Sequence, residues 1–238
     1  VEELPQEIAG CELMRRSCFV VLLLVLSAIT LAAQDSGQSL HPRTPTVRFD
    51  CYWEAARPQE YIITVQAAGK TSYLSRNPVV LTRSSTPQLP DYQIEFTMSA
   101  VNSNKIFKMA ERANYFQGNF DYTKHAMANT GKKTLTYSDL SRHSQTVYNY
   151  SENKAIQELT RIFQNISTTL EHGRKLAFMH KYDKLGIDSE LRAAEEEAQN
   201  HQLAEVQVIA PVLQSIVDDP TVLNMARRRA ARILKLSR

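Results

Sequence analysis

A loop rich in aromatic residues carries the carboxylate best placed to do chemistry in this sequence. Asp121 lies between Phe120 and Tyr122, and His125 follows four residues later. A carboxylate within reach of an imidazole can move a proton, so one hypothesis is a hydrolase that uses Asp121 and His125. The rings offer a second use as a stacking surface for a sugar or a peptide side chain, although aromatic residues beside a sheet also fit its core. The candidate contact residues for a ligand or partner are Tyr115, Phe116, Phe120, Asp121 and Tyr122.

The last part of the chain carries a cluster of cations. No acidic residue follows Asp219, and the apolar residues between Val222 and Leu234 are spaced for one face of a helix. Such a helix can lie on an anionic membrane surface. Alternatively, it docks by its apolar face and leaves the basic face in water, which the helix dipole and the moderate apolarity of the stripe favour. The candidate contacts with an anionic surface are Arg227, Arg228, Arg229 and Arg232.

Several sequences that resemble catalytic motifs lack essential parts. Gly69-Lys70-Thr71 has Thr64 where a phosphate-binding loop needs its first glycine, and a strand follows it, so it predicts a hairpin turn. The chain contains no Gly-x-Ser-x-Gly sequence. Cys51 is in phase with Val47, Phe49 and Trp53 on the apolar face of a predicted strand. Burial there would raise the pKa of its thiol and make it inert. We therefore predict no catalytic residue and no cofactor.

The spacing of the histidines does not predict a metal site. No two of them lie four residues apart, the spacing that brings two ligands onto one helix face. His172, His180 and Asp183 converge only if one helix carries all three, since they are near whole turns apart. Surface groups near a helix end are the simpler interpretation, because a cation suits that end of the dipole. We predict no metal ligand.

The elements that must position these residues begin with a run of strands. Apolar residues alternate with polar ones from Val47 through Trp53 and again from Tyr61, with Gly69-Lys70 as a turn. The strands predicted in this way are 47–53, 61–66, 71–76 and 94–98. A later pair, 134–137 and 146–150, is predicted to be joined through residues 138–144.

Helical spacing of apolar residues predicts a helix over 102–113 and a long helix after Ser151, its expected N-cap. Gly173 is the expected end of that helix or a kink in it. Three more helices are expected: one capped by Asp188, one over 203–217 that Pro211 kinks or delays, and one from Asp219-Pro220 to about Leu236.

These elements predict an α+β fold in which an antiparallel sheet packs with two helices and an all-α segment follows. The predicted α+β domain covers residues 46–172 and the helical domain covers 174–238. The chain has 238 residues, 43% of them hydrophobic and 22% charged, which excludes collagen-like, disordered and cysteine-dense classes. Its formal net charge of +3 is too small to favour a nucleic-acid partner.

The N-terminal segment has the three parts of a secretory signal. Arg15 and Arg16 form a basic start, Phe19–Leu26 is an unbroken apolar run, and small residues lead to Gln34. We expect a signal peptide over 1–33, with the start at Met14 rather than in Val1–Leu13, and a linker over 34–45. The apolar run is shorter than the ~20 residues that span a bilayer, and the alternative is an uncleaved N-terminal anchor. The expected location is periplasmic or extracellular.

One stretch of the sequence resembles a known domain. The hairpin residues Tyr61, Ile63, Val65, Gly69 and Tyr73, followed by a strand, a helix, two strands and a helix, are similar to a small α+β domain of secreted bacterial proteins. The resemblance covers residues 46–170. Members often have paired cysteines before the second strand, where this chain has Ala55-Ala56-Arg57-Pro58. The resemblance implies a fold and an exported location, and no reaction.

Together these features favour an exported envelope protein that acts as a non-catalytic interaction or structural module. The expected partner is an envelope protein or a polysaccharide, with an anionic membrane surface as a further contact and no nucleic acid. The alternatives are a periplasmic hydrolase using Asp121 and His125, and a binder of a small ligand or a metal.

Overall fold

The computed structural model describes residues 44–76 and 89–236. These residues belong to one compact unit. The predicted signal peptide at 1–33 and the linker up to residue 43 lie outside the described residues, so both stay predictions. Within the described ranges, we find no helix with the length and apolarity needed to cross a membrane.

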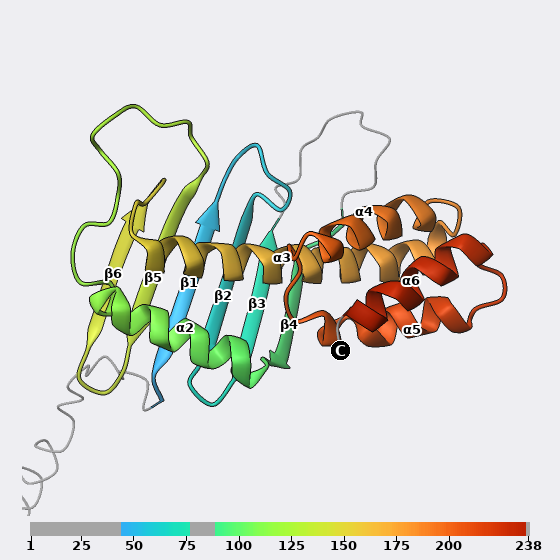
Figure 1. Cartoon of the computed structure of the whole chain (residues 1–238), viewed down its shortest axis with the longest axis horizontal. Helices are drawn as coiled ribbons and strands as arrows, with labels where there is room; N and C mark the ends of the chain where they lie inside the picture. Colours follow the sequence, from blue (N-terminus) through green and yellow to red (C-terminus); the bar gives the residue numbers. More distant parts are fainter. Residues whose placement is uncertain (1–43, 77–88, 237–238) are drawn as a thin grey trace, which may run out of the picture. The chain divides into compact units, whose positions relative to one another are not determined.

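Six antiparallel strands form a single sheet in the order β4-β3-β2-β1-β5-β6 (Figure 1). The predicted α+β class with an antiparallel sheet is therefore confirmed. The strands are β1 (Thr46–Tyr52), β2 (Glu60–Gln66), β3 (Lys70–Arg76), β4 (Tyr92–Thr97), β5 (Lys132–Ser138) and β6 (His143–Tyr148).

Among the described residues, helices cover one face of the sheet and leave the other open. Val47, Phe49 and Cys51 of β1 point to the covered face and are buried, whereas the residues between them point to the open face. Helices α2 (Ala100–Arg112) and α3 (Lys154–Tyr182) lie across the covered face (Figure 1). The ring of Phe49 stacks on the ring of Phe163 in α3, with 5.0 Å between centroids, so the predicted apolar stripe of this helix forms the core.

The second half of α3 continues beyond the sheet and carries the C-terminal helices (Figure 1). These are α4 (Ile187–Gln199), α5 (Ala210–Asp218) and α6 (Asn224–Leu236), and two short 3-10 helices are η1 (Asn114–Phe116) and η2 (Val206–Val208). The predicted all-α C-terminal segment is thus present. α3 passes unbroken through Gly173, where a Cβ atom would lie 2.3 Å from Cγ2 of Ile209. The glycine permits close helix packing and does not end the helix.

The helical segment is tied to the sheet layer by a buried carboxylate. Glu205 accepts hydrogen bonds from the hydroxyl and the backbone N–H of Ser99, at 2.7 and 2.8 Å, and from the amide of Asn102 at 2.6 Å. Ser99 is the N-cap of α2, where a negative charge is favourable. The boundary that the sequence placed at 172–174 falls inside α3.

Three predicted helix starts are shifted. Asn153, and not Ser151, caps α3 by accepting the N–H groups of Ala155 and Ile156. Asp188 lies inside the first turn of α4, where its carboxylate accepts from Arg229 at 3.1 Å. The carboxylate of Asp219 closes a turn by accepting the N–H of Thr221, and α6 begins only at Asn224. Short polar side chains can close a turn as well as cap a helix, so their positions in the sequence did not identify the first residue of each helix.

Candidate functional site

The aromatic loop predicted to contact a partner is packed against the rest of the protein. Phe116 is fully buried, so its ring faces the core and not a ligand. The ring of Tyr115 lies 4.7 Å from that of Tyr137 and carries the guanidinium of Arg142 at 3.8 Å. Phe120 packs on the core as a partly buried side chain. The stacking surface expected from the sequence is largely used for internal contacts.

Asp121 and His125 are not joined as an acid–base pair. The carboxylate of Asp121 accepts the backbone N–H of Asn149 at 2.8 Å, which fastens the loop to the end of β6. The ring of His125 lies beside that of Tyr122, with 6.1 Å between centroids. The surrounding hollow has a volume of about 220 Å³. The geometry therefore gives Asp121 a structural role in the loop.

A buried lysine completes the anchoring of this loop. The ammonium of Lys133 donates to the carbonyl oxygens of Thr130 (2.9 Å), Gly131 (3.2 Å) and Asn149 (2.9 Å), and its side chain is almost fully buried. Burial lowers the pKa of Lys133. The charged ammonium of Lys133 thus holds the end of the loop through its hydrogen bonds to these carbonyl oxygens.

The arginines predicted to meet an anionic surface fall into two groups. Arg229 and Arg232 bind the buried carboxylate of Glu195 in α4, and these hydrogen bonds lower the pKa of Glu195. Arg227 donates to the carbonyl of Val217. Arg228 is exposed and donates to Asn224. The apolar face of α6 is buried, as the docking alternative expected. Half of the predicted cluster, however, binds α4 and does not lie in water as that alternative expected.

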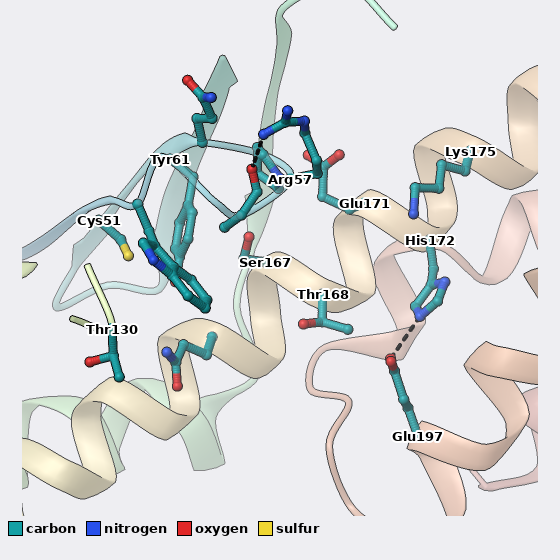
Figure 2. Close-up of a pocket in the computed structure, with 15 residues that line it drawn as sticks. Cys51, Arg57, Tyr61, Thr130, Ser167, Thr168, Glu171, His172, Lys175 and Glu197 are labelled. Carbon is teal, nitrogen blue, oxygen red and sulfur yellow. Dashed lines mark hydrogen bonds and ion pairs between the residues drawn. The ribbon is translucent and has the colours of Figure 1, made fainter. Parts of the chain in front are cut away.

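A cleft of about 360 Å³ lies between the loop that joins β1 to β2 and one face of α3. We call it the Trp53 cleft. Its α3 wall is a polar stripe at helical spacing, with Glu197 of α4 at one end (Figure 2). The stripe consists of Gln164, Ser167, Thr168, Glu171, His172 and Lys175. The opposite wall consists of Cys51, Trp53, Ala56, Arg57, Pro58, Gln59 and Tyr61, and Thr130 also lines the cleft.

Trp53 lies outside the strand to which the alternation assigned it. β1 ends at Tyr52, and the N–H of Trp53 donates to the carbonyl of Gln59 across the loop at 2.8 Å. Gly131 lets the chain pack closely against Trp53, because a Cβ atom at Gly131 would lie only 2.7 Å from Cβ of Trp53. The side chain keeps 39% of its surface exposed. A half-exposed indole on the wall of a cleft is a stacking surface.

The floor of the Trp53 cleft is a saturated polar cluster. The buried carboxylate of Glu171 accepts the hydroxyls of Tyr73 and Ser75, at 2.9 and 2.7 Å, and pairs with Arg174 at 3.1 Å. Burial, and then the charge of Glu171, raise the pKa of Tyr73, so this phenol stays a donor. Because each oxygen of Glu171 has partners, the group is positioned to hold the wall and not to transfer a proton.

His172 lies between two carboxylates of α4. Its Nδ1 is 2.7 Å from Oε1 of Glu190, and its Nε2 is 2.7 Å from Oε2 of Glu197. Burial alone would lower the pKa of His172, but the hydrogen bonds and charges of Glu190 and Glu197 outweigh it and raise the pKa. Both the raised pKa and the two contacts favour the imidazolium form, in which His172 joins α3 to α4.

The rim of the Trp53 cleft carries two more cations. Arg57 donates from Nη1 to the carbonyl oxygens of Glu54 and Ala56, at 3.2 and 2.8 Å, so its charge meets carbonyl dipoles. The ammonium of Lys175 lies 3.6 Å from the Glu190 oxygen that also binds His172. Both side chains can rotate toward a ligand.

Cys51 lies on the cleft wall but is 6% exposed. Burial raises the pKa of its thiol, and a hydrogen bond with Tyr61 only partly opposes this. The structure thus supports the prediction of an inert, structural thiol.

The residues weighed for a metal site are separated. His172 binds carboxylates on opposite ring nitrogens, His180 pairs with Asp219 at 2.9 Å, and Asp183 accepts the N–H of Gly186. Within residues 44–76 and 89–236, no group of three or more His, Cys, Asp or Glu side chains is arranged to hold a metal ion.

The sequence analysis did not find the Trp53 cleft. One available signal was the polar stripe on α3, which runs beside the apolar stripe at the same spacing. The position of Glu197 opposite His172 depends on how α4 folds back, which no local pattern encodes.

Comparison with known protein families and with curated proteins finds no match to this chain.

Proposed function

We propose that this protein is an exported module of the cell envelope that binds a partner without transforming it, and that the Trp53 cleft is its binding site. The observation that carries the proposal is a difference between the reactive polar groups and the groups that surround the cleft. Those able to do chemistry, Cys51, Glu171 and Asp121, are buried or bound within the protein. The groups around the cleft are different. They are the indole of Trp53, Arg57, which donates to backbone carbonyl oxygens, and Lys175, which shares the carboxylate of Glu190 with His172.

The size of the cleft limits the group that it takes. A volume of about 360 Å³ is at the small end of ligand sites. It suits one sugar unit or one amino-acid side chain projecting from an envelope polysaccharide or protein. The apolar segment before Gln34 supports export, and we expect the mature chain to start near that residue, as N-terminal sequencing of the secreted protein would show.

Sedimentation with cell-envelope fragments tests this function. The full chain and Trp53→Ala are mixed with fragments, either intact or freed of protein by protease and detergent. We expect the parent chain to sediment and Trp53→Ala to lose most of its binding; binding that survives the treatment identifies a polysaccharide. Tyr52→Ala is the matched control, because Tyr52 is an exposed aromatic residue on the open face of the sheet. Equal sedimentation of the parent and Trp53→Ala would exclude the cleft as the binding site.

The exposed cations of α6 support a second, weaker contact with an anionic membrane surface. Arg228 and Arg232 are both exposed, but Arg232, like Arg229, is bound to Glu195, so Arg228 is the better candidate for this contact. Exposed cations attract such a surface only within about a Debye length, ~8 Å.

A further inference from the structure

His172 connects the Trp53 cleft to helix α4. Its side chain is 7% exposed, and it lines the cleft together with Glu197. Nδ1 of His172 lies 2.7 Å from Oε1 of Glu190, and Nε2 lies 2.7 Å from Oε2 of Glu197. We call this pair of contacts the His172 clamp. Figure 2 shows the contact with Glu197 at one end of the cleft, so half of the clamp forms part of the cleft wall.

The two carboxylates of the clamp are held to different degrees. Glu190 has 14% of its side chain exposed, and it also faces the ammonium of Lys175 at 3.6 Å. Glu197 is 34% exposed. Within the described part of the chain, Nε2 of His172 is the one partner of the Glu197 carboxylate. Glu197 is therefore the carboxylate that can leave.

The position of Glu197 in its helix also disfavours its charge. α4 ends at Gln199, so Glu197 lies in the last turn, where the helix dipole is negative. Glu195 and Glu196 precede it directly. The proton on Nε2 of His172 thus holds a carboxylate against an unfavourable local field.

The charged groups around His172 come from three elements. They are Glu190 and Glu197 of α4, Glu171, Arg174 and Lys175 of α3, and Arg57 of the loop between β1 and β2. Toward α5, the neighbour of Gly173 is the apolar residue Ile209. Glu171 is paired with Arg174, and Arg57 donates to backbone carbonyl oxygens. Burial lowers the pKa of His172, but the two carboxylates of α4 outweigh it and raise the pKa above its usual value of 6.5.

Loss of one proton from the ring changes the two contacts unequally. A neutral imidazole has one N–H donor and one bare nitrogen. Glu190 is the more buried carboxylate, so it loses more if its donor is removed, and the proton stays on Nδ1. The bare Nε2 then faces an oxygen of Glu197, and two acceptors without a proton between them repel each other. Glu197 is partly exposed and can turn into water.

We propose that the His172 clamp is a pH-sensitive latch on the Trp53 cleft: the charged ring fixes Glu197 in the cleft wall, and loss of the Nε2 proton releases Glu197 and weakens binding of the partner. The inference rests on the proposed function, since it states how binding in the same cleft is regulated. A partner that meets the released form must order the wall again, and this cost lowers its affinity. Binding is therefore tightest below the folded pKa of His172 and weakens as the pH rises through that pKa.

Sedimentation with cell-envelope fragments at several pH values tests the latch. The full chain is measured from pH 5.5 to pH 9 at constant ionic strength. We expect its dissociation constant to rise by about tenfold across this range, the effect of one charged hydrogen bond. Because the fragments also titrate, the parent chain is compared with each variant at every pH.

Three variants separate the latch from other titrations. Glu197→Gln should remove the pH effect, since an amide can accept from a protonated Nε2 and donate to a bare one. His172→Gln should also remove it, because its amide does not titrate. His180→Gln is the matched control and should keep the effect. His180 also pairs with a carboxylate, that of Asp219 at 2.9 Å, but it lies about two turns further along α3.

Hydrogen exchange without fragments follows the release itself. Residues 195–200 include the last turn of α4 and its C-cap. Released Glu197 no longer ties this turn to α3. After correction for the intrinsic rate, exchange in 195–200 should rise between pH 5.5 and pH 9 in the parent and in His180→Gln, and should stay level in Glu197→Gln.

Two results would overturn the latch and leave the proposed function intact. One is a pH profile shared by the parent and Glu197→Gln, in sedimentation or in exchange. The other is a pH effect that His180→Gln removes as fully as Glu197→Gln does. A parent chain that sediments at no pH would instead overturn the proposed function, and the latch with it, so the two failures are distinguishable.

Discussion

The aromatic loop and the Trp53 cleft use similar residues for opposite purposes. In the loop, Lys133 and Asp121 form hydrogen bonds with backbone atoms of the same loop and of the residue that follows β6. In the cleft, Arg57 and Lys175 stand at an opening next to a half-exposed indole. Residue type alone therefore does not identify a binding site. A binding site needs a charged group that lies at an opening and can exchange its partner for a ligand.

The largest effect is expected from Lys133→Ala, which tests the structural side of this comparison. It leaves the carbonyl oxygens of Thr130, Gly131 and Asn149 without their donor, and should lower the free energy of unfolding by about 3 kcal/mol. Lys132→Ala, at the exposed neighbouring position, should change it little. Denaturant unfolding measures both. Equal stability of the two variants would show that Lys133 does not anchor the loop.

His172→Gln tests the cleft side and should have the next largest effect. Since the folded pKa of His172 is raised, its stabilising contribution is complete below the unfolded value of about 6.5 and is lost as the pH rises through the folded pKa. We expect the variant to be less stable than the parent by about 2 kcal/mol at pH 5.5. The difference should shrink at pH 9. Unfolding curves at both pH values show this, and a difference independent of pH would contradict the charged clamp.

Cys51→Ala lies between the two regions, because Cys51 lines the cleft and pairs in register with Lys133 on β5. We expect a loss of about 1 kcal/mol from the cavity of one small buried side chain. Sedimentation with envelope fragments should persist. Peptide-resolved mass spectrometry of the native full chain should show slow modification of Cys51 by a bulky thiol reagent. Rapid modification would make the thiol accessible and the cleft wall mobile.

The smallest effect is expected from Asp121→Ala. It removes the acceptor for the N–H of Asn149 at a partly exposed site, so about 0.5 kcal/mol should be lost. Hydrogen exchange should rise in residues 119–131. Sedimentation with envelope fragments should stay that of the parent. Lost sedimentation would show that the loop and the Trp53 cleft form one site.

The fold was largely predictable because its signals are local. Alternation in β1 and the apolar stripe on α3 each bury one face, and both patterns are visible in a short window. The alternation failed at Trp53, since the loop to β2 turns the chain one residue earlier. The N-cap of α3 was misplaced because Ser151 and Asn153 are both able to accept backbone N–H groups.

The candidate site was not predictable, because its partners are distant in the sequence. His172 meets Glu197 through a separation of 25 residues, and Tyr73 meets Glu171 through 98. The run Glu195-Glu196-Glu197 looks uniform in sequence, yet its members differ in the structure. Glu195 binds two arginines of α6, Glu196 is exposed, and Glu197 reaches the cleft. Helix phase and the packing of α4 between α3 and α6 decide these roles.

The most direct test of the account is the protonation state of His172 in the folded chain. If both carboxylates are ionised, hydrogen bonds of 2.7 Å from opposite ring nitrogens need a proton on each nitrogen. Nitrogen-15 NMR of the histidine side chains, with His172 assigned from His172→Gln, reads this at pH 7. The account predicts two N–H groups on His172 at pH 7, each bonded to a carboxylate of α4. A neutral ring with one bare nitrogen at pH 7 would contradict the clamp.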